Sequence, residues 1–374
     1  MVTILACQSK KRLRLFEQIP EILYAQDLFF VPPFPGSVRK LIGKDSPLVR
    51  MGGELHPFIA YKNGKPVGRI AAIVNPAHNK YYNDTVGFFG FFEFTNDEEV
   101  ARALLEKARE TLKERGLTIM RGPYSPTVND ECGLLIEGFE SIPFVLMAYN
   151  PPYYAAMYEK LGLAKVRDLY AFYLSAATTP PEKVARVAER VRKRTGVTFR
   201  NLSMKYLNEE LKIIQKLYNE TLCRNWGFVP ITYEELQHAA DDLKAIVDPE
   251  MVIIAEKDGR PIGFSMVIPN INEFMFTARR FKKPWMRVLA FAWLLKTKQP
   301  REARMTVLGV LPEYRASGIS AVFYYEALVR GHQRYTGGEL SWIEESNKEM
   351  MQGISLLGGK KYRTYGIYEK AASV

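Results

Sequence analysis

A short motif combines the residue types best suited to binding an anion. Residues 308–320 read LGVLPEYRASGIS and lie between an expected strand, 304–311, and an expected amphipathic helix, 319–335. A loop that opens a helix presents successive backbone N–H groups, and the positive end of the helix dipole favours a phosphate there. Gly318 has no side chain to hold a ligand away, and Arg315 could add a charge-assisted contact. The motif therefore predicts a phosphate site.

A second segment, 339–347 (ELSWIEESN), offers carboxylates for proton transfer. It is expected to form the strand beside 304–311. Glu344 and Glu345 stand near its end, and the period-two alternation of a strand places them on opposite faces. At most one of them would face a bound substrate, where it could act as a general base.

The elements that position these motifs follow from turns and periodicity. Asn63-Gly64 and Asp258-Gly259 each separate two apolar runs, which is the strongest short signal for a β-hairpin. Helices are expected at 13–26, 97–115, 208–222 and 233–247. In each half a helical region precedes the hairpin. A strand with a long helix follows, and a final helix and strand close the half, at 153–174 and 347–370. This order describes an α/β fold of the α+β type with a mixed sheet.

The same order occurs twice because the sequence repeats. Residues 60–68 (AYKNGKPVG) return 195 positions later as 255–263 (AEKDGRPIG). A repeat of this length exceeds the period of solenoid units and indicates two copies of a whole domain. We expect domains at 1–175 and 182–374, separated by a stretch rich in small residues that ends at Pro180-Pro181.

The motif at 308–320 resembles the acyl-CoA pyrophosphate loop of the GCN5-related N-acetyltransferase (GNAT) family. That pattern is Gln/Arg-x-x-Gly-x-Gly/Ala, and Arg315-x-x-Gly318-x-Ser320 fits it with one departure, at Ser320. The hairpins and the order of elements agree along nearly the whole chain. The resemblance implies two tandem GNAT-like domains and a cofactor that is acetyl-CoA or another acyl-CoA.

The resemblance also implies site residues. Glu345 is the preferred general base, since it lies in a Trp342-x-x-Glu345-x-Asn347 segment like the one that closes this strand in related tandem proteins, and Glu344 is the alternative. No metal ligand is expected. Cofactor contacts are implied at Leu308, Val310, Arg315, Ala316, Ser317, Gly318, Ile319, Ser320 and Asn347.

The family's usual general acid is missing from both copies. Family members often carry Asn, then Tyr seven residues on, then Gly four further on, and that Tyr protonates the leaving thiolate. Asn347 and Gly358 fit the pattern, but Ile354 occupies the Tyr position. In the first half Tyr158 has the right spacing before Gly162 and is expected to be a packed aromatic residue. The remaining candidates are Tyr324, Tyr362 and Tyr365.

The first half carries no phosphate motif after its corresponding strand. Asp97, Glu98 and Glu99 open the helix there, which is good capping chemistry but would repel a phosphate. We therefore expect the first domain to bind no CoA and to form a wall of the acceptor site.

Composition sets broader limits. The 374 residues are 47% hydrophobic and 25% charged, as in ordinary globular proteins, and carry a formal net charge of +11 that favours anionic partners. Three scattered cysteines suit neither a disulfide framework nor a zinc site and favour a cytoplasmic location. The most apolar stretch, 285–295, is too short to span a membrane. DNA is not expected as a partner.

An insert at 270–301 distinguishes the second copy. Its basic and aromatic part, 279–301, could cover an anionic ligand, bind RNA or lie on a membrane surface, but packing on its own domain is favoured.

The function expected from the sequence is acyl transfer from acyl-CoA, with acetyl-CoA preferred, to an unidentified amine in a direct ternary complex. Two other classes stay open: a non-catalytic acyl-CoA sensor or scaffold, and a transferase dependent on aminoacyl-tRNA, as in Fem proteins.

Overall fold

The computed structural model describes residues 1–177 and 182–372 and divides into two compact units. Unit 1 comprises Met1–Leu169, Phe274–Leu294 and Arg363–Val374, and unit 2 comprises Tyr170–Glu273 and Leu295–Tyr362. The sequence repeat predicts domains at 1–175 and 182–374, whereas the two units are defined by contacts within the structure. The division into these two domains therefore stays a prediction. The predicted linker residues 178–181, with Pro180-Pro181, lie outside the described residues.

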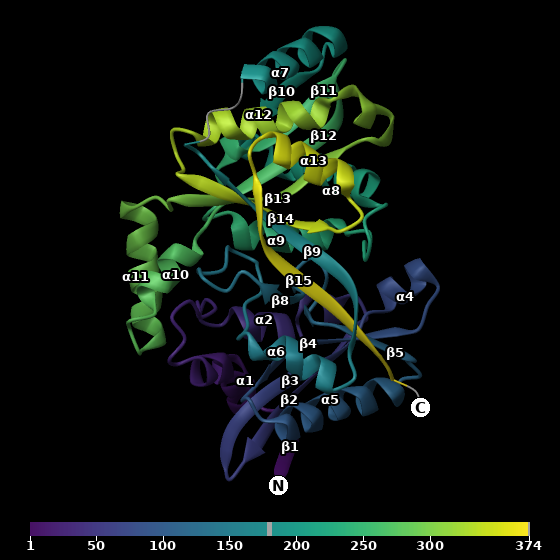
Figure 1. Ribbon diagram of the computed structural model, residues 1–374, viewed down its shortest axis with the longest axis vertical. Coiled ribbons are helices and arrows are strands. Elements are labelled where there is room, and N and C mark those ends of the chain that lie inside the picture. Colours follow the sequence, from purple (N-terminus) through teal and green to yellow (C-terminus); the bar gives the residue numbers. More distant parts are fainter. Residues whose placement is uncertain (178–181, 373–374) are drawn as a thin grey trace. The chain divides into compact units, whose positions relative to one another are not determined.

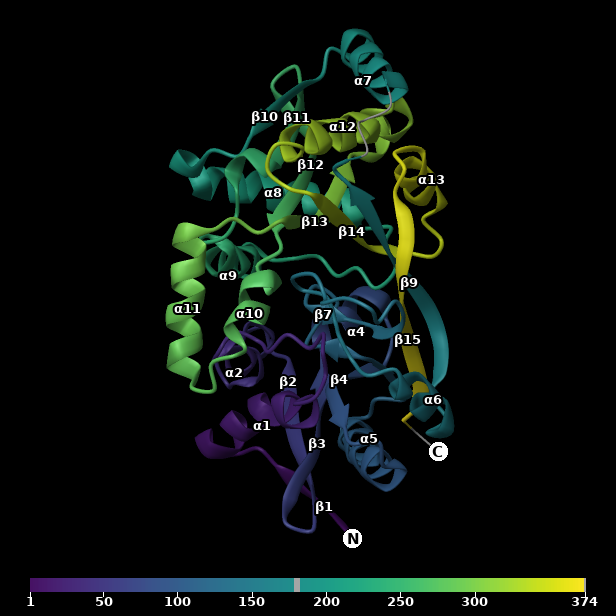
Figure 2. The ribbon, with the colours of Figure 1, turned by 60° about the vertical axis from the view of Figure 1, so that its left-hand side comes forward.

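Unit 1 contains a mixed sheet (Figures 1 and 2). Its strands follow the order β1 (Val2–Ala6), β2 (Glu54–Lys62), β3 (Lys65–Val74), β4 (Val86–Phe94), β5 (Ile119–Gly122) and β15 (Lys360–Ala371). β4 and β5 are parallel, and the other neighbours are antiparallel. β8 (Leu134–Glu137) also pairs with β15, and β6 (Tyr124–Ser125) pairs with β7 (Glu131–Cys132).

Helices α1 (Lys10–Leu23) and α5 (Glu98–Lys113) of unit 1 pack on this sheet. The other helices of unit 1 are α2 (Ser37–Ile42), α3 (Pro47–Arg50), α4 (Pro76–Tyr82), α6 (Tyr153–Lys160), most of α10 (Asn272–Ala278) and most of α11 (Pro284–Thr297). α5 begins where the Asp97 carboxylate accepts from the Glu99 backbone N–H at 3.0 Å. Its inward residues, Leu104 and Leu105 among them, are fully buried in the core against β2–β4.

Unit 2 repeats this arrangement. Its strands follow the order β9 (Ala164–Ser175), β14 (Gly337–Glu344), β13 (Glu302–Val310), β12 (Arg260–Pro269), β11 (Val252–Lys257) and β10 (Thr198–Asn201). β13 and β14 are parallel, and the pairs from β13 to β10 are antiparallel. Its helices are α7 (Glu182–Thr195), α8 (Leu207–Leu222), α9 (Tyr233–Leu243), α12 (Ile319–Gly331) and α13 (Lys348–Leu356). The mixed α/β fold that the sequence predicts is confirmed.

Both predicted hairpin turns form. Asn63 and Gly64 have φ of 53° and 73°, and Asp258 and Gly259 have φ of 50° and 76°. Two consecutive left-handed residues make the type I′ turn, whose twist matches that of the flanking strands. Asn, Asp and Gly adopt this conformation more easily than other residues, which is why the signal was reliable.

The strands that close the two sheets are exchanged between the copies. The sequence places 167–174 at the end of the first half and 362–370 at the end of the second. In the structure, the last residues of β9 belong to unit 2 beside β14, whereas Tyr368–Ala371 of β15 pairs with β5 in unit 1. Because the copies are alike, the closing strand of either one fits the edge of either sheet, as in domain swapping.

Candidate active site

The predicted phosphate loop lies where β13 leads into α12. A 3₁₀ turn, Pro312–Ser317, connects the strand to Gly318, which caps α12 with φ of +82°. A Cβ at Gly318 would also come within 3.1 Å of Val191 Cγ2 on α7. Glycine is therefore required here by the left-handed backbone and by the packing of α7, in addition to any ligand. The sequence correctly placed Ala316, Ser317, Ile319 and Ser320 around this helix start.

Arg315 folds back onto the protein from the same loop. Its Nη2 donates to the Thr221 carbonyl at 2.7 Å and its Nε to the Val310 carbonyl at 3.3 Å. Both contacts tie the loop to the end of α8 and the end of β13. In this geometry Arg315 positions the loop, and direct contact with a phosphate stays a prediction.

A second arginine reaches the loop from α7, which the sequence did not single out. Arg194 Nη2 donates to the Ser317 carbonyl at 2.6 Å from the exposed last turn of α7. α7 lies beside α12 (Figure 2) and ends with Arg192, Lys193 and Arg194. The basic last turn was visible in the sequence, but its proximity to a loop more than a hundred residues away was not.

The central strands separate beside the loop. β13 and β14 pair through Glu302–Met305 and Gly337–Leu340 and then continue as strands to Val310 and Glu344. The predicted contact residues Leu308 and Val310 lie on this separated part of β13. Glu344 ends β14, where its carboxylate accepts from the Ser346 backbone N–H at 3.0 Å, and half-buried Glu345 follows in the turn. Glu344 and Glu345 thus lie at the end of β14, beyond its paired part, and their role as a base stays a prediction.

A buried polar cluster holds the strands together at the point of separation. Arg304 Nε donates to Ser341 Oγ at 2.7 Å and lies 3.6 Å from the Glu339 carboxylate. Ser341 and Tyr362 both donate to that carboxylate. Arg304, Glu339 and Ser341 are all at least 95% buried, so the ion pair is shielded from water. Because two hydroxyl donors and the Arg304 charge already engage Glu339, it is better suited to fixing the strands than to accepting a substrate proton.

The residues that could act as the general acid toward the leaving thiolate lie in different surroundings. Ile354 is fully buried in an apolar cluster. Tyr324 lies beside it, and burial raises the pKa of its phenol. Burial likewise raises the pKa of Tyr158, which packs in the core of unit 1 as expected. Asn347 accepts from the Met350 N–H at 3.3 Å and so caps α13.

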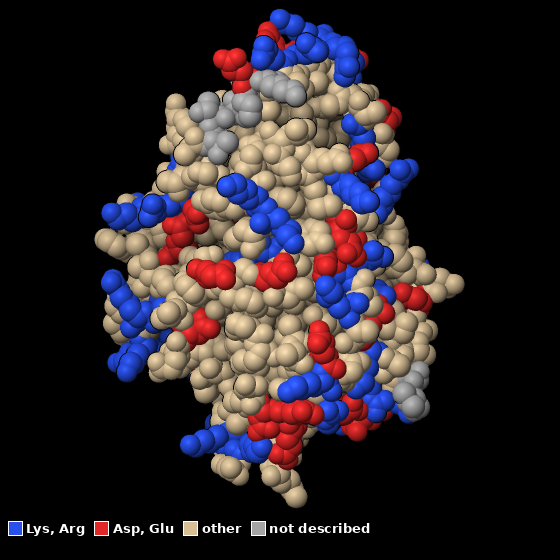
Figure 3. All heavy atoms as spheres, in the orientation of Figure 1, with Lys and Arg blue, Asp and Glu red and all other residues tan. Residues whose placement is uncertain are grey.

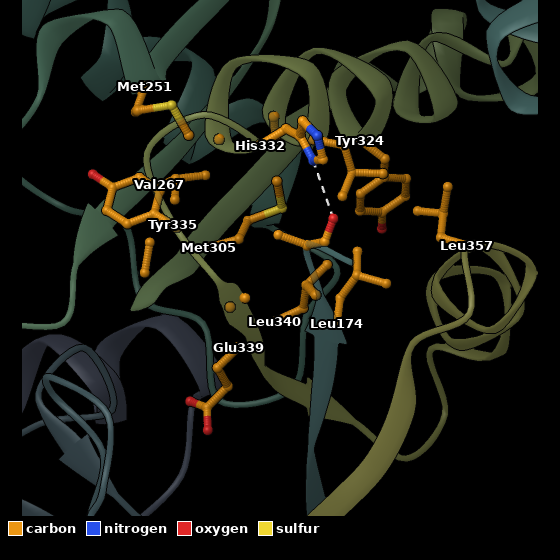
Figure 4. A pocket seen from close by; sticks show the side chains of 17 residues that line it. Leu174, Met251, Val267, Met305, Tyr324, His332, Tyr335, Glu339, Leu340 and Leu357 are labelled. Carbon is orange, nitrogen blue, oxygen red and sulfur yellow. Dashed lines mark hydrogen bonds between the residues drawn. The ribbon is translucent and has the colours of Figure 1, made fainter. Parts of the chain in front are cut away.

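An apolar pocket of about 540 Å³, including its open mouth, lies under the second half of α12 (Figure 4). The sequence did not predict it, because its lining comes from several elements that are separate in the sequence. Glu339 lies at one end with its carboxylate turned away from the apolar side chains, and His332 Nδ1 lies 3.1 Å from the Ala176 carbonyl. The apolar lining comprises Leu174, Met251, Val267, Ala303, Met305, Tyr324, Ala327, Leu328, Tyr335, Leu340 and Leu357.

The equivalent opening in unit 1 is filled by its own chain. β4 and β5 pair only over Val86–Phe88 and Ile119–Arg121. Beyond this point a Cβ at Gly90 would lie 1.4 Å from the Tyr124 carbonyl oxygen, and Ser125 accepts from the Phe91 N–H at 3.0 Å. The chain at Tyr124 and Ser125 thus lies against β4 beyond its paired part.

Two further kinds of chemistry find no support among residues 1–177 and 182–372. No group of three His, Cys, Asp or Glu side chains there could hold a metal ion. Burial raises the pKa of the Cys132 thiol well above its usual range, which disfavours a covalent acyl intermediate on it. Nor is any helix in this part of the chain long and apolar enough to cross a bilayer.

The chain has the fold of tandem GNAT proteins. A solved tandem GNAT protein from the clavulanic acid biosynthesis pathway shares the fold with a TM-score of 0.60 at 12% identity, over 100% of this chain and 99% of that one. No family model matches the sequence.

Two curated proteins match at the level of sequence. Protein YghO of Escherichia coli is 33% identical over 97% of this chain and 93% of its own length. The bacterial ceramide synthase of Caulobacter vibrioides is 31% identical over 99% of this chain and 97% of its own length. The chain belongs to the family of these two proteins.

Proposed function

We propose that the protein transfers a long acyl chain from acyl-CoA to the amine of a long-chain amino alcohol. One relative is named a ceramide synthase, and a ceramide is an N-acylated long-chain amino alcohol. The observation that carries the proposal is the position of the apolar pocket. Its lining includes the second half of α12, the helix whose first turn follows the phosphate loop.

The two ends of α12 suit the two ends of the donor. The amides around Gly318, assisted by Arg194, would hold the pyrophosphate. The pantetheine arm would follow the separated part of β13, at Leu308 and Val310, and the acyl chain would enter the pocket. Burial of each methylene contributes about 0.8 kcal/mol, so a long chain would be strongly preferred to the acetyl group expected from the family resemblance.

The reaction would be direct. The neutral amine attacks the thioester carbonyl, the C–S bond breaks and the amide C–N bond forms. Glu345, with Glu344 as the alternative, accepts the amine proton directly or through water. A thiol has an ordinary pKa near 8.5, so the CoA thiolate can leave without the missing tyrosine. The free thiols Cys7, Cys132 and Cys223 agree with a cytoplasmic site of action.

The test is turnover by the purified full chain with acetyl-, octanoyl- or palmitoyl-CoA and a long-chain 2-amino-1,3-diol. We expect thiol release and amide formation, seen by mass spectrometry, with the longer donors and only when the amine is present. CoA binding without thioester consumption would instead establish the sensor. Transfer of an amino acid from aminoacyl-tRNA, absent with uncharged tRNA, would establish the Fem-like class.

The base assignment has its own test. Glu345→Gln should lower kcat about 100-fold or more while leaving the Kd of acyl-CoA unchanged. Glu349→Gln, at an exposed position on α13, is the matched control and should retain full activity. If Glu344→Gln is inactive and Glu345→Gln is not, the two roles are reversed.

A further inference from the structure

α11 presents an apolar outer face to solvent. Trp285, Leu289 and Trp293 are 58%, 61% and 58% exposed and stand four residues apart, which puts them in one stripe along the helix. Val288 and Ala292, also exposed, widen it. Exposed patches of large apolar side chains on one element usually mark an interaction site.

The opposite face of α11 is fixed on unit 1. Arg287 Nη1 lies 2.7 Å from the Glu21 carboxylate of α1, and Phe291 packs edge-on against Phe34 at 5.4 Å between ring centroids. Arg287, Phe291 and Leu294 are buried. The stripe is therefore held in a fixed orientation on a packed helix.

Basic residues flank the stripe at both ends. Residues 274–301 contain no Asp or Glu. Arg280, Lys282 and Lys283 precede the stripe, Lys296 and Lys298 follow it, and all five are exposed. Figure 3 shows Lys and Arg side chains gathered along the left-hand edge, where Figure 1 places α11.

We propose that this face of α11 docks on the surface of an anionic phospholipid bilayer. Tryptophan favours the headgroup level, leucine and valine the acyl boundary, and lysines the negative surface of anionic lipids. The 14 residues of α11 span about 21 Å, which is shorter than a hydrocarbon core of about 30 Å. The helix therefore lies along the interface and does not cross it. This inference rests on α11 alone and does not depend on the identity of the acyl acceptor.

The charge pattern distinguishes a bilayer from other occupants. A second copy docked by the same face would bring the lysines of one protomer close to those of the other, with no carboxylate in 274–301 to balance them. RNA would use the lysines and stack on tryptophans, but would leave the aliphatic residues Val288, Leu289 and Ala292 without an apolar partner.

The experiment is sedimentation of the purified full chain with vesicles of phosphatidylcholine, alone or with one-third phosphatidylglycerol. We expect binding to the anionic vesicles that weakens with salt, together with a blue shift of tryptophan fluorescence, since Trp285 and Trp293 are two of four tryptophans. Replacing Trp285, Leu289 and Trp293 by Ala should weaken binding at least about 30-fold. Each of Lys282, Lys283 and Lys296 changed to Gln should weaken it about fivefold.

Matched variants elsewhere on the surface serve as controls. Met204, Tyr206 and Leu356 are exposed apolar residues, and replacing all three by Ala should leave binding like that of the native chain. Lys212, Lys216 and Lys244 are exposed lysines, and changing each one singly to Gln should also leave binding unchanged. Circular dichroism confirms that each variant is folded. The proposal is overturned if the native chain does not bind anionic vesicles, or if the α11 variants bind as well as it does. The proposal is also overturned if the native chain does not bind vesicles but self-associates or binds RNA, and the α11 variants lose that binding. The face would then be assigned to a second copy or to RNA.

Discussion

Arg194 contacts the phosphate loop from outside it. The guanidinium donates to the Ser317 carbonyl at 2.6 Å and remains exposed, so it can also face a bound anion. We expect Arg194→Gln to raise the KM for acyl-CoA about three- to tenfold with little change in kcat, since an exposed charge contact contributes modestly. Steady-state kinetics measures this. Arg186→Gln, two turns earlier on α7, is the control and should leave KM unchanged. Equal effects at both positions would indicate general attraction by α7 rather than contact at the loop.

His78 makes the stability of unit 1 depend on pH. Its ring is buried against Tyr82 and Phe88, and burial lowers its pKa to about 4, even though the Asp84 carboxylate opposes this shift. The folded chain therefore keeps His78 neutral, whereas the unfolded chain takes up a proton below a pKa of about 6.5. Stability is complete above that value and falls by about 3 kcal/mol as the pH drops to 4.

Urea unfolding at about pH 7 and pH 4.5, followed for the native chain and His78→Phe, checks this assignment. The phenyl ring keeps the packing and removes the titration, so the variant should lose less stability on acidification. His238→Gln is the control. If both variants show the same pH dependence as the native chain, other groups determine the acid sensitivity.

Residues of the site differed in how far the sequence could predict them. Gly318 and Arg315 stand in one contiguous motif, whose local conformation the structure bears out. Arg304, Glu339 and Tyr362 come from three strands, and only the fold brings them together. The sequence shows a charged residue, Arg304, inside an apolar strand, which indicates a buried ion pair. It does not show which residue Arg304 pairs with.

At the scale of elements, α12 links the two parts of the proposed donor site. Ala327 is on the pocket side of its second half. We expect Ala327→Phe to fill the pocket, so that kcat/KM for palmitoyl-CoA falls at least tenfold relative to octanoyl-CoA. Competition between the two donors in one reaction measures the ratio. Val329→Phe, at an exposed position two residues on, is the control. An unchanged ratio in Ala327→Phe would place the acyl chain elsewhere.

Elements defined by local signals were predicted with few errors. The hairpin turns and the Asp97 cap of α5 depend on residues next to one another, and they are where the sequence put them. The sequence did not predict which closing strand completes which sheet, because the patterns of β9 and β15 suit either copy. The pocket was missed for a related reason: its lining is a property of packed elements.

For the molecule as a whole, the two copies differ at corresponding positions. In unit 2 the central strands separate beside a phosphate loop, whereas in unit 1 Gly90 packs against the Tyr124 main chain in that place. A helix cap by Asp97 replaces the loop. These differences favour the second copy as the proposed acyl-CoA site.

Strand exchange makes each copy depend on the other. Unit 1 needs β15 from Arg363 onward, and Arg363 is fully buried and donates to the carbonyls of Gly138, Ser141 and Ile142. If a protease site is inserted between residues 177 and 182 and cleaved in the folded protein, the two fragments should co-elute on size exclusion, even at high salt. They should separate only in denaturant, because separation would expose the edge of β5 and empty the Arg363 site. Arg363→Met should lower the free energy of unfolding of the cleaved complex by about 2–4 kcal/mol, because three carbonyls lose the buried guanidinium that donates to them. Fragments that separate in buffer and remain folded would show that each copy closes its sheet with its own strand.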